Sequence, residues 1–219
     1  MTLLKSGAEG ARLIDGPVGK LEVILRDGNQ QGPFSHGNYY AVIAHPHPLY
    51  GGTMDNKVVT TVARIYRELG IPVARFNFRG VGASEGHHDN ANGEVLDLLA
   101  VASHLQSACS GSRLLIAGYS FGAAVAASAS LQVPPAHLLL VAPPVGRYPF
   151  APEGAFPCPL LMVLGDRDDL VDVEQANHWG RALNSPVECR VIEGADHFFD
   201  GNLKGLTESI APVLSKSLT

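Results

Sequence analysis

The chain has 219 residues, of which 46% are hydrophobic and 17% charged, and its formal net charge is −5. This composition is that of one globular domain and excludes a disordered or membrane-embedded chain. A mildly acidic chain without a basic cluster is poorly suited to phosphate backbones, so we expect no nucleic-acid partner. The longest apolar runs are far shorter than the ~20 residues that span a bilayer, so we expect no membrane partner.

Apolar runs of strand length alternate with helical patterns from residue 39 onward, which indicates a mostly parallel sheet with helices on both faces. Two short antiparallel strands are expected first, around residues 13–14 and 21–25. Further strands are expected at 39–44, 71–76, 113–117, 137–141, 160–164 and 187–192. Helices are expected at about 56–69, 95–105, 121–131, 173–183 and 203–214. The predicted fold class is therefore α/β, with about eight strands in one domain spanning residues 1–219.

The cysteines and the N-terminus indicate the cellular compartment. Cys109, Cys158 and Cys189 are odd in number and lack the spacing of metal ligands, which argues against a disulfide framework or a zinc site. The first ten residues contain one lysine and no apolar core, so they do not resemble a secretory signal. A cytoplasmic protein with reduced cysteines is expected.

The pattern Gly-x-Ser-x-Gly occurs twice, around Ser84 and around Ser120. Only Ser120 lies between a predicted buried strand and a helix of small residues, which is the setting of a nucleophile elbow. Ser84 is followed by a loop sequence. The alternative role for Ser120, a simple helix N-cap, does not require both glycines. The context therefore predicts Ser120 as a nucleophile.

A serine hydroxyl needs a base to take its proton and a carboxylate to orient that base. His197 follows the last predicted strand, and acidic residues follow the strand that ends at Leu164. Of these, Asp172 is expected to cap a helix, because Gln175 stands three residues later. Asp166 and Asp168 remain as candidates. The order serine, aspartate, histidine is that of the α/β-hydrolase triad.

Two long motifs carry a resemblance over essentially the whole chain: HPHPLYGGTMDNKV at residues 45–58 and RFNFRGVGAS at residues 75–84. Both are similar to the α/β-hydrolase superfamily, specifically its small bacterial members without a cap domain. In that superfamily the acid usually lies in Gly-x-x-Asp followed by a hydrophobic residue two places on, which maps to Asp168. The resemblance thus implies Ser120, Asp168 and His197 as the catalytic residues, with Asp166 as the second choice for the acid. Asn77 replaces a structural aspartate of the superfamily, so no loss of activity is inferred.

The oxyanion of a tetrahedral intermediate requires two backbone N–H donors. The first is expected from Phe121, which follows the nucleophile at a helix N-terminus. The second is expected from the loop after the strand at 39–44, where proline amides cannot serve. His47 is the candidate by alignment with the superfamily, and Leu49 or Tyr50 is the alternative.

No cofactor or metal is expected. His45 and His47 lack a third ligand nearby in sequence. The stretch at residues 80–85 begins like a dinucleotide fingerprint, but Glu85 stands where the third small residue should pack. We expect Arg79 and Glu85 to anchor this loop instead.

These features predict a serine hydrolase, specifically a carboxylesterase that acts on small esters with short acyl groups. A thioesterase or small-peptide hydrolase would use the same residues, and a catalytically silent ligand-binding protein on the same fold is the alternative from another class. The stretch 142–159 is too short for a helical cap, so the site is expected to be open. Several aromatic residues of the surrounding loops are expected to form its wall, and the others to cover the core: Tyr50, Tyr119, Phe121, Tyr148, Phe150 and Phe198.

Overall fold

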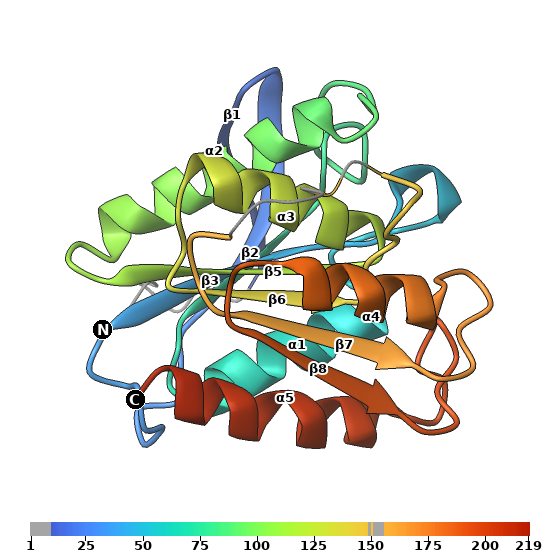
Figure 1. The fold of residues 1–219 in the computed structure, drawn as a ribbon. Coiled ribbons are helices and arrows are strands. Elements are labelled where there is room, and N and C mark those ends of the chain that lie inside the picture. Colours follow the sequence, from blue (N-terminus) through green and yellow to red (C-terminus); the bar gives the residue numbers. More distant parts are fainter. Residues whose placement is uncertain (1–9, 149, 151–155) are drawn as a thin grey trace.

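A twisted eight-stranded sheet runs through the part of the chain that the computed structural model describes, residues 10–148, 150 and 156–219 (Figure 1). The strand order is β1-β2-β4-β3-β5-β6-β7-β8. The pairs β1–β2 and β2–β4 are antiparallel, and the other neighbouring strands are parallel to each other. The strands are β1 (Ala11–Gly16), β2 (Gly19–Arg26), β3 (Tyr39–Ala44), β4 (Val73–Phe76), β5 (Arg113–Tyr119), β6 (His137–Val141), β7 (Leu160–Gly165) and β8 (Val187–Ile192).

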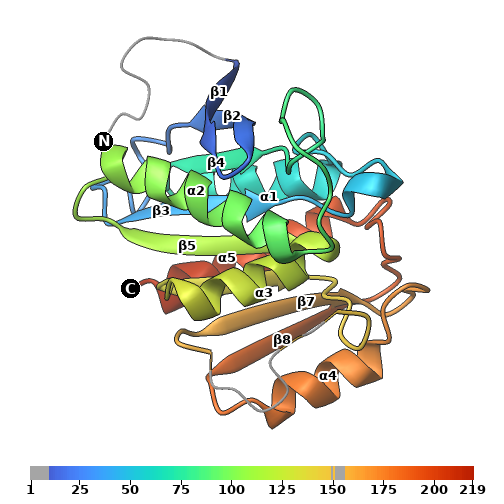
Figure 2. The same ribbon diagram turned by 90° about the horizontal axis from the view of Figure 1, so that it is seen from above.

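Helices cover both faces of the sheet (Figures 1 and 2). On one face lie α2 (Asn92–Ala108), α3 (Phe121–Gln132) and α4 (Val173–Ala182). On the other face α1 (Lys57–Glu68) packs beside α5 (Leu203–Ser217). Because both faces are covered, the central strands β3, β6 and β7 are buried at every position, as continuous apolar runs predict.

The predicted α/β fold and its eight strands are confirmed, and the differences are the ends of elements and one additional short helix. Strand β4 begins at Val73 rather than at residue 71, since Gly70 turns the chain with φ 89° and Pro72 has no amide hydrogen for the ladder. Strand β5 runs two residues beyond the prediction, to Tyr119. A 3₁₀ helix, η1 (Pro48–Tyr50), was not predicted.

The proline-rich stretch between β6 and β7 contains no helix in its described residues, 142–148, 150 and 156–159. The remaining positions of this predicted loop, Pro149 and 151–155, lie outside the described residues.

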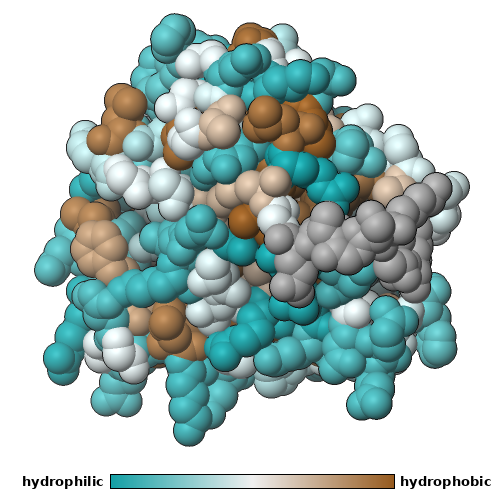
Figure 3. Space-filling model, turned by 180° about the vertical axis from the view of Figure 1, so that it is seen from behind, coloured by the Kyte–Doolittle hydropathy of each residue, from teal (hydrophilic) through white to brown (hydrophobic). Residues whose placement is uncertain are grey.

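The face opposite to the view of Figure 1 is mostly hydrophilic, and its hydrophobic side chains lie in small separate groups (Figure 3). Within the described residues, every helix is either too short or too polar to cross a membrane.

Candidate active site

Ser120 occupies the sharp turn between β5 and α3, with φ 53° and ψ −121°. A positive φ is unusual for a residue with a Cβ and costs on the order of 1–3 kcal/mol. A Cβ on Gly118 would lie 2.0 Å from the carbonyl oxygen of Gly122, and a Cβ on Gly122 would lie 2.4 Å from that of Ala44. These close approaches explain why glycine flanks Ser120 on both sides.

The structure brings Ser120, His197 and Asp168 together from three separate loops at the carboxyl edge of the sheet. His197 Nε2 lies 3.0 Å from Ser120 Oγ, and His197 Nδ1 lies 2.8 Å from Asp168 Oδ2. The Asp168 side chain is fully buried, and its other oxygen accepts the amides of Leu170 and Val171, each at 2.8 Å. This carboxylate therefore has hydrogen-bond partners on both oxygens.

The two other acids considered for this site bond elsewhere. Asp166 accepts the amide of Gly194 at 2.6 Å, which ties the end of β7 to the turn after β8. Asp172 accepts the amide of Gln175 at 2.9 Å and caps α4, as the sequence predicts.

The loop after β3 brings His47 next to Phe121, with ring centroids 4.8 Å apart. Within this loop the amide of Leu49 donates to His47 Nδ1 at 3.2 Å, and that of Tyr50 donates to the His47 carbonyl oxygen at 3.1 Å. Those two amides are therefore engaged inside the loop. Among the described residues, no such partner exists for the amide of His47.

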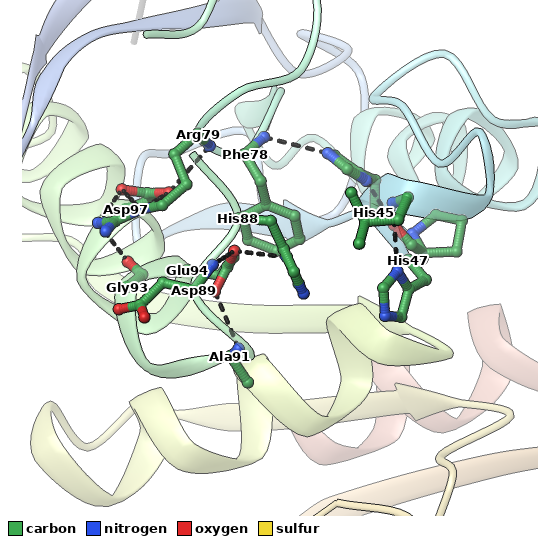
Figure 4. Close-up of polar contacts among 12 residues, drawn as sticks. His45, His47, Phe78, Arg79, His88, Asp89, Ala91, Gly93, Glu94 and Asp97 are labelled. Carbon is green, nitrogen blue, oxygen red and sulfur yellow. Dashed lines mark hydrogen bonds and ion pairs between the residues drawn. The ribbon is translucent and has the colours of Figure 1, made fainter. Parts of the chain in front are cut away.

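His45 holds this loop to the segment after β4 (Figure 4). Its Nε2 accepts the amide of Phe78 at 3.0 Å, and its Nδ1 lies 2.6 Å from the Pro46 carbonyl oxygen, to which it donates. The side chain is completely buried, and this burial lowers the pKa of His45 to about 4. His45 is thus neutral at physiological pH, with one fixed tautomer.

A buried carboxylate, Glu94, supports the other side of the His47 loop (Figure 4). It accepts the amides of Asp89 and Ala91, both at 2.9 Å, and His88 Nδ1 lies 2.8 Å from its Oε1. The ring of His88 packs against those of His47 and Phe121, with centroids 5.0 and 5.5 Å away. Glu94 therefore holds the turn that places His88 against the two residues predicted to bind the oxyanion.

A pocket of about 500 Å³ opens in front of Ser120 and His197. The other residues that line it are His47, Tyr50, Phe121, Pro144, Arg147, Tyr148, Leu170 and Val171. Of the six aromatic candidates for the wall, Tyr50, Phe121 and Tyr148 line the pocket. Phe150 instead packs against Trp179 in the core, and Phe198 is exposed beside His197.

The second Gly-x-Ser-x-Gly serine has a structural role. The Ser84 hydroxyl donates to the Asn77 carbonyl oxygen at 2.7 Å and accepts the amide of Glu22 at 2.9 Å. Arg79 pairs with the buried Asp97 at 2.8 Å, which anchors the same loop as expected.

No metal-binding cluster of three or more His, Cys, Asp or Glu side chains occurs among the described residues. All three cysteines are free thiols. Burial raises the pKa of Cys109 to about 11 and that of Cys158 to about 12, so these thiols stay protonated at neutral pH.

A family model described as an alpha/beta hydrolase domain matches residues 40–210. The chain belongs to the alpha/beta hydrolase family. An uncharacterised protein of Rickettsia prowazekii is 36% identical to this hydrolase over 195 residues, which cover 84% of this chain and 80% of that one.

Two solved structures show the same architecture. An alpha-beta serine hydrolase homologue from Coxiella burnetii matches with a TM-score of 0.90 and 43% identity, over 96% of this chain and 100% of that one. A serine hydrolase without lid from Xanthomonas campestris matches with a TM-score of 0.90 and 35% identity, over 97% of this chain and 96% of that one. The resemblance to hydrolases without a cap domain is confirmed at the level of the fold.

Sequence reasoning missed one contact in this hydrolase that positions the histidine. The Tyr119 hydroxyl donates to the His197 carbonyl oxygen at 2.9 Å, and its ring is buried beneath the site rather than exposed in the pocket wall. Tyr119 is the last residue of β5, and its ring lies 5.6 Å from that of His197. The sequence carries no local signal for this contact, because the two residues are far apart in the chain.

Proposed function

We propose that this hydrolase is a serine carboxylesterase that cleaves small esters with short acyl groups through an acyl-enzyme. The observation that carries the proposal is the unbroken chain of contacts from Ser120 through His197 to Asp168. Ser120 and His197 line the 500 Å³ pocket, so a substrate in the pocket can reach them. The strained turn at Ser120 supports it, because strain of this kind collects at functional sites.

In the proposed mechanism, Ser120 Oγ attacks the carbonyl carbon of the ester while His197 Nε2 takes its proton. The C–O bond to the alcohol then breaks, and His197 returns the proton to the departing oxygen. Water attacks the acyl-enzyme by the same route and releases the acid. Throughout, Asp168 holds the imidazole with Nε2 toward the serine and stabilises its protonated form.

The oxyanion of each tetrahedral intermediate would bind to the amides of Phe121 and His47. Phe121 is the first residue of α3, so its amide lacks an acceptor within the helix and benefits from the helix dipole. His47 is favoured over Leu49 and Tyr50, because the latter two amides already donate within the loop. Each such donor contributes about 3–4 kcal/mol to transition-state stabilisation.

Substrate size follows from the shape of the pocket. Each buried methylene of the acyl chain contributes ~0.8 kcal/mol until the apolar wall ends. The apolar and aromatic residues that line the pocket are Tyr50, Phe121, Pro144, Tyr148, Leu170 and Val171. In a series of 4-nitrophenyl esters from acetate to laurate, kcat/KM should peak at short acyl groups and show no jump above the micellar threshold. A rise that continues to long chains would contradict the short-acyl assignment.

The experiment that tests the proposed nucleophile compares two serines from the same sequence pattern. Ser120→Ala should abolish ester hydrolysis and labelling by a fluorophosphonate probe. Ser84→Ala should keep both, although it loses about 1–2 kcal/mol of unfolding free energy because two buried hydrogen bonds disappear. Substantial hydrolysis by folded Ser120→Ala would disprove the role of Ser120. A matched oxygen ester and thioester, assayed together, separate a carboxylesterase from a thioesterase.

A further inference from the structure

Arg147 is the side chain that gives the pocket its electrostatic character. Of the described residues that line the pocket, it is the single one with a permanent charge, and no carboxylate is among them. The chain as a whole carries a net charge of −5, so this local positive charge is opposite in sign to that of the molecule. A substrate that enters the pocket therefore meets an arginine rather than an acid.

The backbone around Arg147 is held in a tight turn after β6. The amide of Val145 donates to the Pro143 carbonyl oxygen at 2.8 Å, and that of Arg147 donates to the Pro144 carbonyl oxygen at 3.1 Å. Tyr148 forms a β-bridge with Val145. The ring of Tyr148 also packs edge-on against Phe121 at the base of the pocket, with centroids 5.4 Å apart. The backbone of Arg147 is thereby held beside the proposed oxyanion site, and its exposed side chain extends from there.

The guanidinium of Arg147 forms no ion pair with any described residue. Arg79 shows the contrast, because its guanidinium is buried and bonded to Asp97 and to the Gly93 carbonyl oxygen. Two buried carboxylates near the site are already engaged: Asp168 with His197, and Glu94 with the amides of Asp89 and Ala91. Within residues 10–148, 150 and 156–219, no side chain or backbone group engages the five N–H donors of Arg147, which can therefore face a ligand.

We propose that Arg147 binds a carboxylate carried by the substrate, at the end away from the scissile bond. Guanidinium and carboxylate match as a planar, two-pronged pair, and a single cation balances one negative charge better than the two of a phosphate monoester. This inference rests on the proposed function and specifies its substrate class: esters in which the acid or the alcohol part bears a free carboxylate.

Two matched pairs of substrates test the inference. Monoethyl adipate against diethyl adipate places the charge on the acyl side, and 4-acetoxybenzoate against its methyl ester places it on the leaving-group side. The wild type should show a higher kcat/KM for the anionic member of at least one pair, by roughly twofold to fivefold, the range of an exposed ion pair. Raising the salt concentration should raise KM for the anionic member only, because ions screen the charge pair.

Three variants assign this preference to Arg147. In Arg147→Gln the ratio of anionic to neutral kcat/KM should fall to about one, and in Arg147→Glu it should fall below one. Arg181→Gln, at an exposed position in the last turn of α4, changes the net charge equally and should keep the wild-type ratio.

The outcomes separate failure of the inference from failure of the proposed function. Hydrolysis of both pairs without anionic preference, or a preference that survives in Arg147→Gln, would overturn the inference and leave the esterase standing. If neither pair is hydrolysed, the proposed function fails. Binding of adipate, measured by titration calorimetry, then decides the inference: binding lost in Arg147→Gln supports it, and absent or unchanged binding overturns it.

Discussion

Asp168 and Asp166 stand two residues apart at the end of β7, yet the surroundings of their carboxylates differ. Asp168 touches His197, whereas Asp166 holds the backbone of Gly194. Asp168→Asn should lower kcat by about 10⁴, because an amide favours the wrong imidazole tautomer. Asp166→Asn should keep kcat within about threefold. Steady-state kinetics on a short-acyl 4-nitrophenyl ester measures both values.

The same pair of variants also reports on stability. Each variant retains an oxygen that can accept the backbone amides of the wild type, that of Gly194 in Asp166→Asn and those of Leu170 and Val171 in Asp168→Asn. Thermal unfolding of both variants should therefore stay close to that of the wild type. Reversed kinetic effects would move the role of the orienting acid to Asp166.

At the scale of elements, the N-terminus of α2 and the turn before it form the support behind the His47 loop. Asn90 and Ala91 both have positive φ, and the Glu94 carboxylate compensates for this strain by accepting two amides of the turn. Glu94→Ala should lower the unfolding free energy by about 1–3 kcal/mol, since two partly buried amides lose their acceptor. Urea unfolding measures the loss.

The exposed Asn92, in the first turn of the same helix, provides the control for this substitution. Asn92→Ala should change stability by no more than about 0.5 kcal/mol. Because the His88 ring packs against Phe121 and His47, Glu94→Ala should also lower kcat more than it raises KM. If Glu94→Ala left both the unfolding free energy and kcat unchanged, the turn would not depend on Glu94.

At the scale of the whole molecule, the sequence predicted the features that depend on residues close together in the chain. The buried runs of β3, β6 and β7 and the glycines around Ser120 follow from burial and sterics within a few residues. Contacts between distant segments could not be predicted in the same way. Tyr119 reaches a carbonyl 78 positions away, and His45 accepts an amide 33 positions away. Such bonds depend on the tertiary arrangement, which residue spacing does not encode.

The choice between Asp166 and Asp168 shows the same limit. Both acids follow one strand, and only the family pattern separated them in the sequence. The three-dimensional arrangement supplies a physical reason: the Asp168 side chain is fully buried against His197, while Asp166 turns outward to the loop after β8.

Two buried histidines couple the stability of the whole molecule to pH. Burial lowers the pKa of His45 and of His137, each from 6.5 to about 4. Above pH 6.5 both residues are neutral in the folded and the unfolded chain, so their full contribution to stability is present. As the pH falls from 6.5 towards 4, the unfolded chain binds protons that the folded chain cannot, and this favours unfolding. Lowering the pH from 7 to 5 should therefore reduce the free energy of unfolding by about 2 kcal/mol for each of the two histidines.

His137 allows this effect to be tested without disturbing the proposed site. It lies at the first position of β6, at the opposite end of that strand from the site, and its Nδ1 has no hydrogen-bond partner among the described residues. His137→Leu keeps a side chain of similar size and removes the titrating group. Urea unfolding at pH 7, 6 and 5 should then show about 2 kcal/mol less loss of stability than in the wild type. An equal loss in both proteins would mean that His137 binds its proton as readily in the folded chain as in the unfolded one.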